Sequence, residues 1–249
     1  MKRAFEIFIF LIVAMAFSQD EEAFQRGNSL YNQEKYQEAI DAYKSVLDAG
    51  KESASLYYNL GNAHYKLTNI GPSIYYYEKA LKLAPNDNDI KNNLIFAQNA
   101  TIDAIDVIPE GIVSRIFNRL TNAITYDNWA WFSVICVILF VVLFILYYTA
   151  HVSSRKRLFF VGSWLVLFFG LFGLFFAFRQ YDTIKKNQFA IIFAQETTIK
   201  SEPNLRSEEV FQLHEGTKVQ VTETINNWKK IKLADGKIGW IPATDLREL

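Results

Sequence analysis

The chain of 249 residues carries 26 basic and 26 acidic residues, a neutral balance that gives no electrostatic reason to expect nucleic-acid binding. Hydrophobic residues make up 51% of the chain and gather in three blocks: at the N-terminus, around 129–150 and around 158–178. A soluble core would spread them along the chain, so the sequence predicts a membrane protein with small soluble parts. The single cysteine, Cys136, lies in an apolar block, which excludes a disulfide framework or a cysteine-based metal site.

The first residues have the pattern of a secretory signal peptide. Lys2 and Arg3 give a basic start, an apolar run follows over 8–17, and small residues lead to a cleavage position near Ser18. We therefore predict a signal peptide over 1–18, and an uncleaved membrane anchor is the alternative. In both cases the residues that follow are exported.

The next part of the chain repeats with the period that is typical of helical repeat proteins. Like residues recur 34 positions apart in these pairs: Gly27 and Gly61, Asn28 and Asn62, Tyr31 and Tyr65, Tyr43 and Tyr77. These residue types at this spacing resemble the tetratricopeptide repeat, in which pairs of antiparallel helices stack to bury their apolar faces. The resemblance implies a domain over 20–106, with repeats at about 20–53 and 54–87 and a capping helix over 88–106.

The polar edge of these helices supplies a candidate binding surface. In the tetratricopeptide family, the positions of Asn28 and Asn59 often hold a peptide carboxylate or backbone. Asn62 and Lys66 follow Asn59 at helical spacing and lie on the same face. The resemblance therefore implies a partner-binding groove formed by these four residues. A scaffold that docks a folded protein is the alternative, because Phe24 stands where the family often has a lysine.

The sequence contains no recognisable catalytic constellation. His64, His151 and His214 lie in three separate parts of the chain and are not expected to converge on one metal ion or one base. No P-loop, serine elbow, zinc-protease motif or cysteine pair is present in the sequence. We therefore predict a protein that is not an enzyme and has no cofactor and no metal site. His64 is expected to fill an aromatic position between two repeat helices.

Two apolar segments are each long enough to cross a bilayer, which takes about 20 residues. They lie over 129–150 and 158–178, and neither contains an acidic or basic residue, which argues against an ion pathway. The connector over 151–157 is basic and therefore predicted to be cytoplasmic. With an exported N-terminus, both soluble domains would be periplasmic, on a bacterial inner membrane crossed twice.

The segment over 109–127 precedes the first span and has apolar residues at helical spacing beside Arg115 and Arg119. This pattern favours an amphipathic helix that lies on the lipid bilayer surface. A plain linker helix is the alternative.

The chain over 187–249 changes to the alternating pattern of β-strands. Asp235-Gly236 between two strand-like runs indicates a hairpin, and the segment IGWIP follows it. These features resemble bacterial SH3-like domains, known as SH3b, which implies a small barrel with cell-wall peptides or proteins as ligands. Trp228 and Trp240 are predicted to line a ligand groove, and the alternative is that at least one of them fills the core.

The sequence thus predicts a multidomain membrane protein: an all-α tetratricopeptide helical repeat, a two-helix transmembrane hairpin and a small all-β SH3-like barrel. This order of parts resembles the BatE family of the Bacteroidetes aerotolerance (Bat) operon. The resemblance implies work with other Bat proteins, including membrane proteins with von Willebrand A-domains and a MoxR-type ATPase. It also implies roles in envelope integrity or in tolerance of oxidative stress.

Two functional hypotheses remain open on these observations. The first is a non-enzymatic inner-membrane adaptor that assembles an envelope protein complex through its tetratricopeptide and SH3-like domains. The second is a membrane protein that binds the cell wall (peptidoglycan) through the SH3-like domain and recruits an envelope enzyme. The hypothesis of a transporter subunit is weaker than both, because the spans contain no acidic or basic residue.

Overall fold

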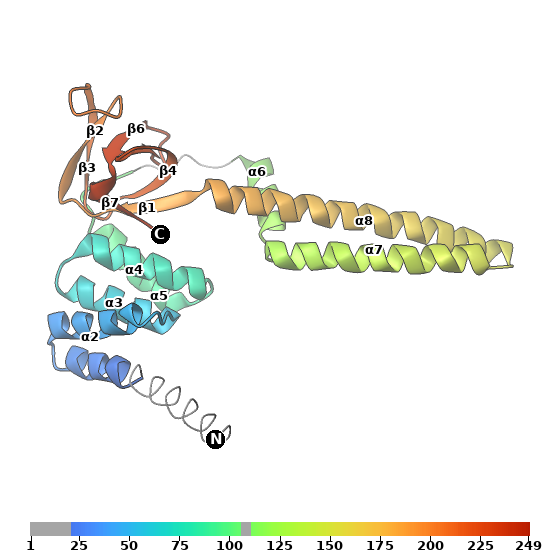
Figure 1. Ribbon diagram of the computed structural model, residues 1–249, viewed down its shortest axis with the longest axis horizontal. Helices are drawn as coiled ribbons and strands as arrows, with labels where there is room; N and C mark the ends of the chain where they lie inside the picture. The colour runs from blue at the N-terminus through green and yellow to red at the C-terminus, as the bar shows by residue number, and fades with distance from the viewer. Residues whose placement is uncertain (1–20, 106–110) are drawn as a thin grey trace, which may run out of the picture. The chain divides into compact units, whose positions relative to one another are not determined.

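The computed structural model describes residues 21–105 and 111–249, so the predicted signal peptide lies outside the described residues. The chain divides into two compact units. One contains the N-terminal helices together with the C-terminal strands from Gln188 to Leu249, and the other is Ile108–Asn187 (Figure 1).

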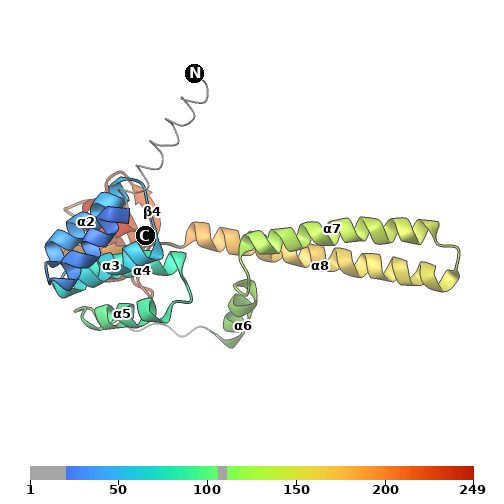
Figure 2. The same cartoon turned by 90° about the horizontal axis from the view of Figure 1, so that it is seen from below.

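The N-terminal helices form a stack of antiparallel pairs. A helix over 21–32 is followed by α2 (Tyr36–Asp48), α3 (Ala54–Lys66), α4 (Ile70–Leu83) and α5 (Asn88–Asn99). Each of α2 to α5 contacts the next (Figure 2). Side chains define two of the starts: Ser53 accepts the backbone N–H of Leu56 before α3, and Asp87 accepts those of Asp89 and Ile90 before α5.

The seam within each repeat depends on a glycine facing a tyrosine. A side chain at Gly61 would place its Cβ 2.6 Å from the ring of Tyr77, and one at Gly27 would overlap the ring of Tyr43. Both rings are almost completely buried. Only glycine allows the two helices to approach so closely, which explains why both glycines recur at the repeat period.

His64 is buried between α3 and α4. Its ring stacks on that of Tyr76, with the centroids 5.4 Å apart, and its Nδ1 lies 3.5 Å from the side-chain nitrogen of Asn69. Its Nε2 is buried without a hydrogen-bond partner. Burial, together with the charges of Lys44 and Arg247, lowers the pKa of His64 to about 4. The ring is therefore neutral at neutral pH and acts as a packing group.

The C-terminal strands form one antiparallel sheet with the order β3-β2-β6-β5-β4-β1-β7. The strands are β1 (Gln188–Ile192), β2 (Glu196–Lys200), β3 (Glu209–His214), β4 (Lys218–Ile225), β5 (Trp228–Lys232), β6 (Ile238–Pro242) and β7 (Leu246–Glu248). The predicted Asp235-Gly236 turn lies in the loop that joins β5 to β6, and Gly236 has φ +91°, a backbone conformation that glycine adopts readily. Alternate strand residues such as Ile199, Val219 and Ile231 fill the core.

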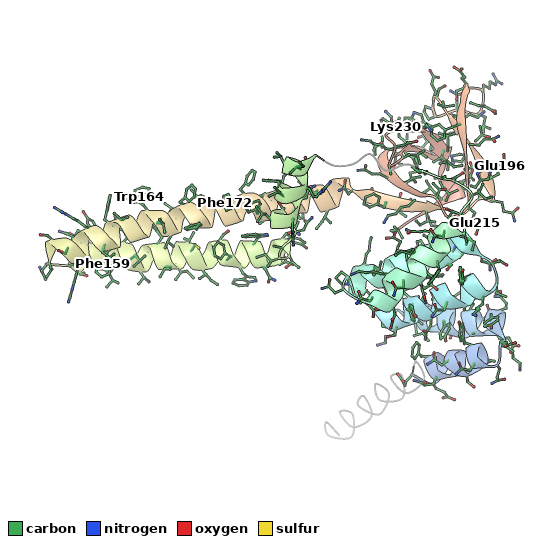
Figure 3. All side chains as sticks on the ribbon, turned by 180° about the vertical axis from the view of Figure 1, so that it is seen from behind. Phe159, Trp164, Phe172, Glu196, Glu215 and Lys230 are labelled. Carbon is green, nitrogen blue, oxygen red and sulfur yellow. The ribbon has the colours of Figure 1, made fainter. Side chains whose placement is uncertain are left out.

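The second unit consists of α6 (Ile112–Thr121), α7 (Tyr126–Thr149) and α8 (Ser153–Lys186). Within the described residues, α7 and α8 are long and apolar enough to cross a membrane, with mean hydropathies of 2.9 and 2.3 over their most apolar stretches. Most of their side chains are exposed, including Trp164 and Phe172, which project from α8 (Figure 3). The core helix of a soluble protein would instead be covered on all sides. Both helices extend beyond the apolar segments read from the sequence.

Small residues bring α7 and α8 together. A Cβ at Gly170 would lie 3.0 Å from that of Cys136, and one at Gly173 would lie 2.8 Å from the hydroxyl of Ser133. Close approach at small residues is the usual way in which apolar helices pack in lipid. Cys136 is buried in this contact between the two helices.

The architecture confirms the predicted fold class. The chain combines a helical tetratricopeptide region, two apolar helices that are able to span a membrane and a C-terminal antiparallel sheet of the SH3-like type.

Replacing His64 with Phe should make the protein less sensitive to acid. Between the unfolded pKa of 6.5 and the folded pKa of about 4, the unfolded chain binds a proton that the folded chain does not. The free energy of unfolding therefore falls as the pH drops through this window, by up to about 3 kcal/mol. Melting of the full chain in detergent, followed by circular dichroism at about pH 7 and about pH 4.5, should show a smaller loss for His64→Phe.

His151→Phe is the matched control, because His151 is exposed in the connector between α7 and α8. It should keep the full acid sensitivity of the natural chain. An equal loss of melting temperature in His64→Phe and His151→Phe would show that burial of His64 has no effect on acid stability.

Candidate functional site

A tyrosine hydroxyl and an asparagine amide form the same hydrogen bond in both repeats. The hydroxyl of Tyr43 donates to Asn28 Oδ1 at 2.8 Å, and that of Tyr77 donates to Asn62 Oδ1 at 2.6 Å. Burial raises the pKa of Tyr43 to about 12 and also raises that of Tyr77. Both phenols therefore stay protonated and act as hydrogen-bond donors throughout the physiological pH range.

A second amide joins each of these pairs to the next repeat. Asn59 Nδ2 donates to Asn28 Oδ1, and Asn93 Nδ2 donates to Asn62 Oδ1, both at 2.9 Å. Asn93 also donates to the hydroxyl of Tyr58 at 2.9 Å. Each acceptor oxygen thus receives two donors, which fixes the orientation of its amide. We refer to Asn28, Tyr43, Asn59, Asn62, Tyr77 and Asn93 as the asparagine ladder.

Two adjacent pockets follow the asparagine ladder, and we refer to them together as the ladder groove. The first has a volume of about 410 Å³ and is lined by Asn28, Tyr31, Asn32, Tyr43, Asn59 and Asn62. The second has a volume of about 210 Å³ and is lined by Tyr31, Asn62, Tyr65, Lys66, Tyr77, Asn93 and Phe96. Tyr31 and Asn62 line both pockets, which makes the surface continuous.

The lining of the ladder groove consists of amides, phenols, one phenyl ring and the single charged group of Lys66. Amides and phenols both donate and accept hydrogen bonds, so the surface suits the backbone of an extended segment. The described lining contains no carboxylate, imidazole or thiol.

The structure brings together all four residues predicted from the helix edge: Asn28, Asn59, Asn62 and Lys66. Among the described residues, the oxygens of Asn28 and Asn62 are occupied within the protein, whereas Asn62 Nδ2 and Asn59 Oδ1 make no hydrogen bond to it. One donor and one acceptor therefore remain for a partner. That these residues bind one stays a prediction.

The contribution of α5 to the ladder groove does not follow from the prediction of a capping helix over 88–106. Asn93 and Phe96 on α5 belong to the groove. The signal was present, because Asn93 follows Asn59 by the same 34 residues that separate Asn28 from Asn62. In this respect α5 behaves like the first helix of a further repeat.

The two tryptophans singled out in the sequence differ in their surroundings. Trp240 on β6 is only 7% exposed, and the ammonium of Lys230 lies 5.6 Å from its ring centroid. Trp228 on β5 is half-buried and is paired with Pro242. Trp240 is thus largely buried, and a ligand contact by either tryptophan stays a prediction.

A second cluster of polar contacts joins the helical repeats to the barrel, and its centre is Asp103. Asp103 Oδ2 accepts the backbone N–H of His214 at 2.7 Å and the hydroxyl of Thr217, and Oδ1 lies 2.7 Å from His214 Nδ1. Burial would raise the pKa of Asp103, but the hydrogen bonds from Thr217 and His214 hold it below its usual range. The carboxylate is therefore charged and fully engaged at neutral pH.

Glu215 and Lys218 continue this contact on α4. The Glu215 carboxylate accepts the backbone N–H of Gly71 at 2.9 Å, and Lys218 Nζ lies 2.7 Å from a carboxylate oxygen of Glu78 (Figure 3). Asn69, at the start of α4, makes no capping hydrogen bond with its side chain. Glu215 of the barrel thus supplies the negative charge that a helix N-terminus favours.

Apolar side chains complete the contact between helices and barrel. Ile191, Phe193 and Leu249 pack against the core of the helical repeats, and Ile105 packs against the core of the barrel. The ring of Phe193 meets that of Tyr75 edge to face, with the centroids 5.5 Å apart. We call the contacts around Asp103, Glu215 and these residues the domain junction.

In the part of the chain that the structure describes, no group of three or more histidine, cysteine or acidic residues is arranged to hold a metal ion.

Comparisons with known proteins agree with the two soluble folds. Residues 24–88 match the family described as tetratricopeptide repeat, and residues 196–247 match the family described as bacterial SH3 domain. No curated protein matches the chain. Among solved structures, the chain is similar to YrrB, described as a TPR protein with an unusual peptide-binding site.

The similarity to YrrB has 29% sequence identity and a TM-score of 0.31. It covers 32% of this chain and 41% of YrrB, so the chain spans about two fifths of that protein's length.

Asn62→Ala should destabilise the helical repeats. It removes the acceptor shared by Tyr77 and Asn93, and a buried donor left without a partner costs about 1–3 kcal/mol. The measurement is the melting temperature of the full chain in detergent by circular dichroism.

Asn32→Ala is the matched control, since Asn32 lines the same groove but makes no side-chain hydrogen bond within the described residues. If the two variants melted at the same temperature, the asparagine ladder would have no part in holding the repeats together.

Proposed function

We propose that the chain is a non-enzymatic membrane adaptor that holds a partner protein in the ladder groove. The single observation that carries the proposal is the groove itself. It is continuous across the repeats, it retains a free donor on Asn62 and a free acceptor on Asn59, and its lining consists mainly of amides and phenols. Such a surface is suited to recognition of an extended segment.

The charge of the ladder groove indicates which kind of partner segment it suits. Lys66 is the only charged residue among those lining the two pockets. Asn93 and Phe96, on the neighbouring helix, are neutral. One cation among amides and phenols favours a neutral or weakly acidic segment over a strongly acidic tail, which several cations would be needed to neutralise.

The domain junction supports an even number of membrane crossings. The helical repeats and the barrel lie on opposite sides of α7 and α8 in the sequence, yet Asp103 contacts His214 directly. Two parts in contact must be on the same side of a membrane, as a hairpin of two spans would place them. The predicted export signal and the basic residues Arg155, Lys156 and Arg157 favour the periplasmic side of a bacterial inner membrane.

We assign α6 to the membrane surface in this arrangement. Ile112, Val113, Ile116 and Leu120 are all more than half exposed, and Arg119 lies in the last turn of the helix. A short helix with an exposed apolar face beside basic residues is suited to the boundary between lipid and water. Its position next to α7 in the chain supports the same assignment.

The order of parts supports a function of the Bat type. On this proposal the adaptor assembles an envelope complex with membrane proteins that carry von Willebrand A-domains and serves envelope integrity or oxidative stress tolerance. The support is the resemblance of the whole arrangement, namely repeats, two spans and an SH3-like barrel.

Co-purification of the full-length chain in mild detergent tests this assignment. A-domain membrane proteins should be recovered with the natural chain. Their recovery should fall several-fold with Lys66→Glu, which reverses the only charge in the ladder groove. Lys44→Glu, an equal charge change at an exposed position on α2 outside the groove lining, should leave recovery unchanged. Recovery of the bait alone would refute the adaptor function.

Reporter fusions test the orientation separately. A reporter that is active only in the periplasm should be active when fused after Leu249, and a cytoplasm-specific reporter should be silent there. The opposite pair of results would place the barrel on the cytoplasmic side.

The match of residues 196–247 to bacterial SH3 domains favours a second candidate function, binding of the cell wall. The full chain in detergent, mixed with purified peptidoglycan, should then sediment with it. The isolated barrel is unsuitable for this assay, because Ile191, Phe193 and Leu249 pack against the helical repeats and would become exposed.

A further inference from the structure

We propose that a pocket at the domain junction binds the C-terminal carboxylate of a peptide, a ligand distinct from the segment held in the ladder groove. This junction pocket has a volume of about 410 Å³. One wall comes from the segment that follows α5, including Asp103 and Ile105, and the other comes from barrel residues such as Phe189, Lys232 and Leu233. The pocket therefore exists only where the helices and the barrel are docked.

The junction pocket contains one cation, Lys232, that has no ion-pair partner among the described residues. The barrel has six lysines, and five of them form ion pairs with carboxylates: Lys200, Lys218, Lys229, Lys230 and Lys237. Lys232, which lines the pocket, is exposed and forms no ion pair within the described residues. Among the described lining residues, Asp103 has the only carboxylate, and its contacts are with His214 and Thr217 and not with Lys232. An anionic group of a ligand would therefore pair with Lys232.

The rest of the lining sets the shape and polarity of the ligand. Ile105, Phe189 and Leu233 offer apolar surface, and Gln98 and Thr101 lie on the opposite wall with polar side chains. A ligand with a carboxylate next to a short apolar side chain matches both the polar and the apolar parts of this lining. The volume fits the last two or three residues of a peptide, since pockets of about 300–1,000 Å³ hold small ligands.

A ligand can occupy the junction pocket only when the helical segment and the barrel are docked against each other. Asp103 contributes to the lining, and its hydrogen bonds to His214 and Thr217 keep the helical segment against the β3–β4 turn. A ligand that contacts both walls therefore stabilises the domain junction as it binds, because it binds the docked state and not the open one.

Calorimetric titration of the full chain in lipid nanodiscs with the peptide acetyl-Gly-Ala-Leu tests the proposal. The peptide with a free carboxylate should bind, and its C-terminal amide should bind about tenfold more weakly or not at all, as expected for loss of a charge-assisted hydrogen bond. A third peptide that ends in D-Ala, as cell-wall peptides do, shows whether the source of the carboxylate is protein or wall. Tighter binding of the L-form supports a protein terminus.

Lys232→Gln should weaken binding of the free acid by about tenfold, which corresponds to one lost charge-assisted contact. Lys237→Gln is the matched control: it removes the same charge from the same hairpin, outside the pocket lining. Equal binding of acid and amide, or equal weakening by the two substitutions, would overturn the assignment.

Lys66→Glu separates this site from the ladder groove. The variant should leave binding of the peptide acid unchanged even if it abolishes recovery of membrane partners. Loss of peptide binding in Lys66→Glu with retention in Lys232→Gln would place the carboxylate in the ladder groove and refute the junction pocket. If only the adaptor proposal is wrong, membrane partners are not recovered, and binding of the peptide acid is unaffected.

Discussion

The Asp103 carboxylate ties together two parts of the chain that the sequence keeps more than 100 residues apart. Its oxygens accept hydrogen bonds from the backbone N–H of His214 and the hydroxyl of Thr217, and one of them lies beside the His214 ring nitrogen Nδ1. All three contacts are made where β3 leads into β4. Removing such a group from water is costly unless hydrogen bonds replace the lost hydration. The helical repeats and the barrel consequently form one compact unit, although two apolar helices separate them in the sequence.

The contact between the helical repeats and the barrel affects the structure of both domains. Glu215 provides the acceptor that α4 lacks at its start, and Ile191 is buried in the core of the helical repeats. The barrel is thus part of the helical domain's packing as well as a module of its own. Binding of a partner to either domain therefore acts on a unit that both domains share. If α7 and α8 cross a membrane, their hairpin returns the chain to the side from which it left.

The ladder groove depends on a different constraint, the regular spacing of the repeats. Tyr43 and Tyr77 are buried because Gly27 and Gly61 make room for their rings, and their hydroxyls then orient Asn28 and Asn62. A partner would meet amides that are already held in place, which reduces the entropy lost on binding. His64, which looks like a reactive residue in the sequence, is instead a neutral ring stacked on Tyr76.

The sequence by itself determined the fold class, the repeat period and the apolar helices. Each of these follows from local patterns: the 34-residue spacing, the long uncharged runs, and the Asp235-Gly236 turn between alternating strands. It also placed Asn28, Asn59 and Asn62 on one surface, because repeat symmetry carries positions from one unit to the next. Only the tertiary structure decided that Asp103 meets His214, that Trp240 is largely buried and that Lys232 lines a pocket shared by two domains. These facts depend on contacts between distant segments, and no local period in the chain encodes which distant residue a side chain will meet.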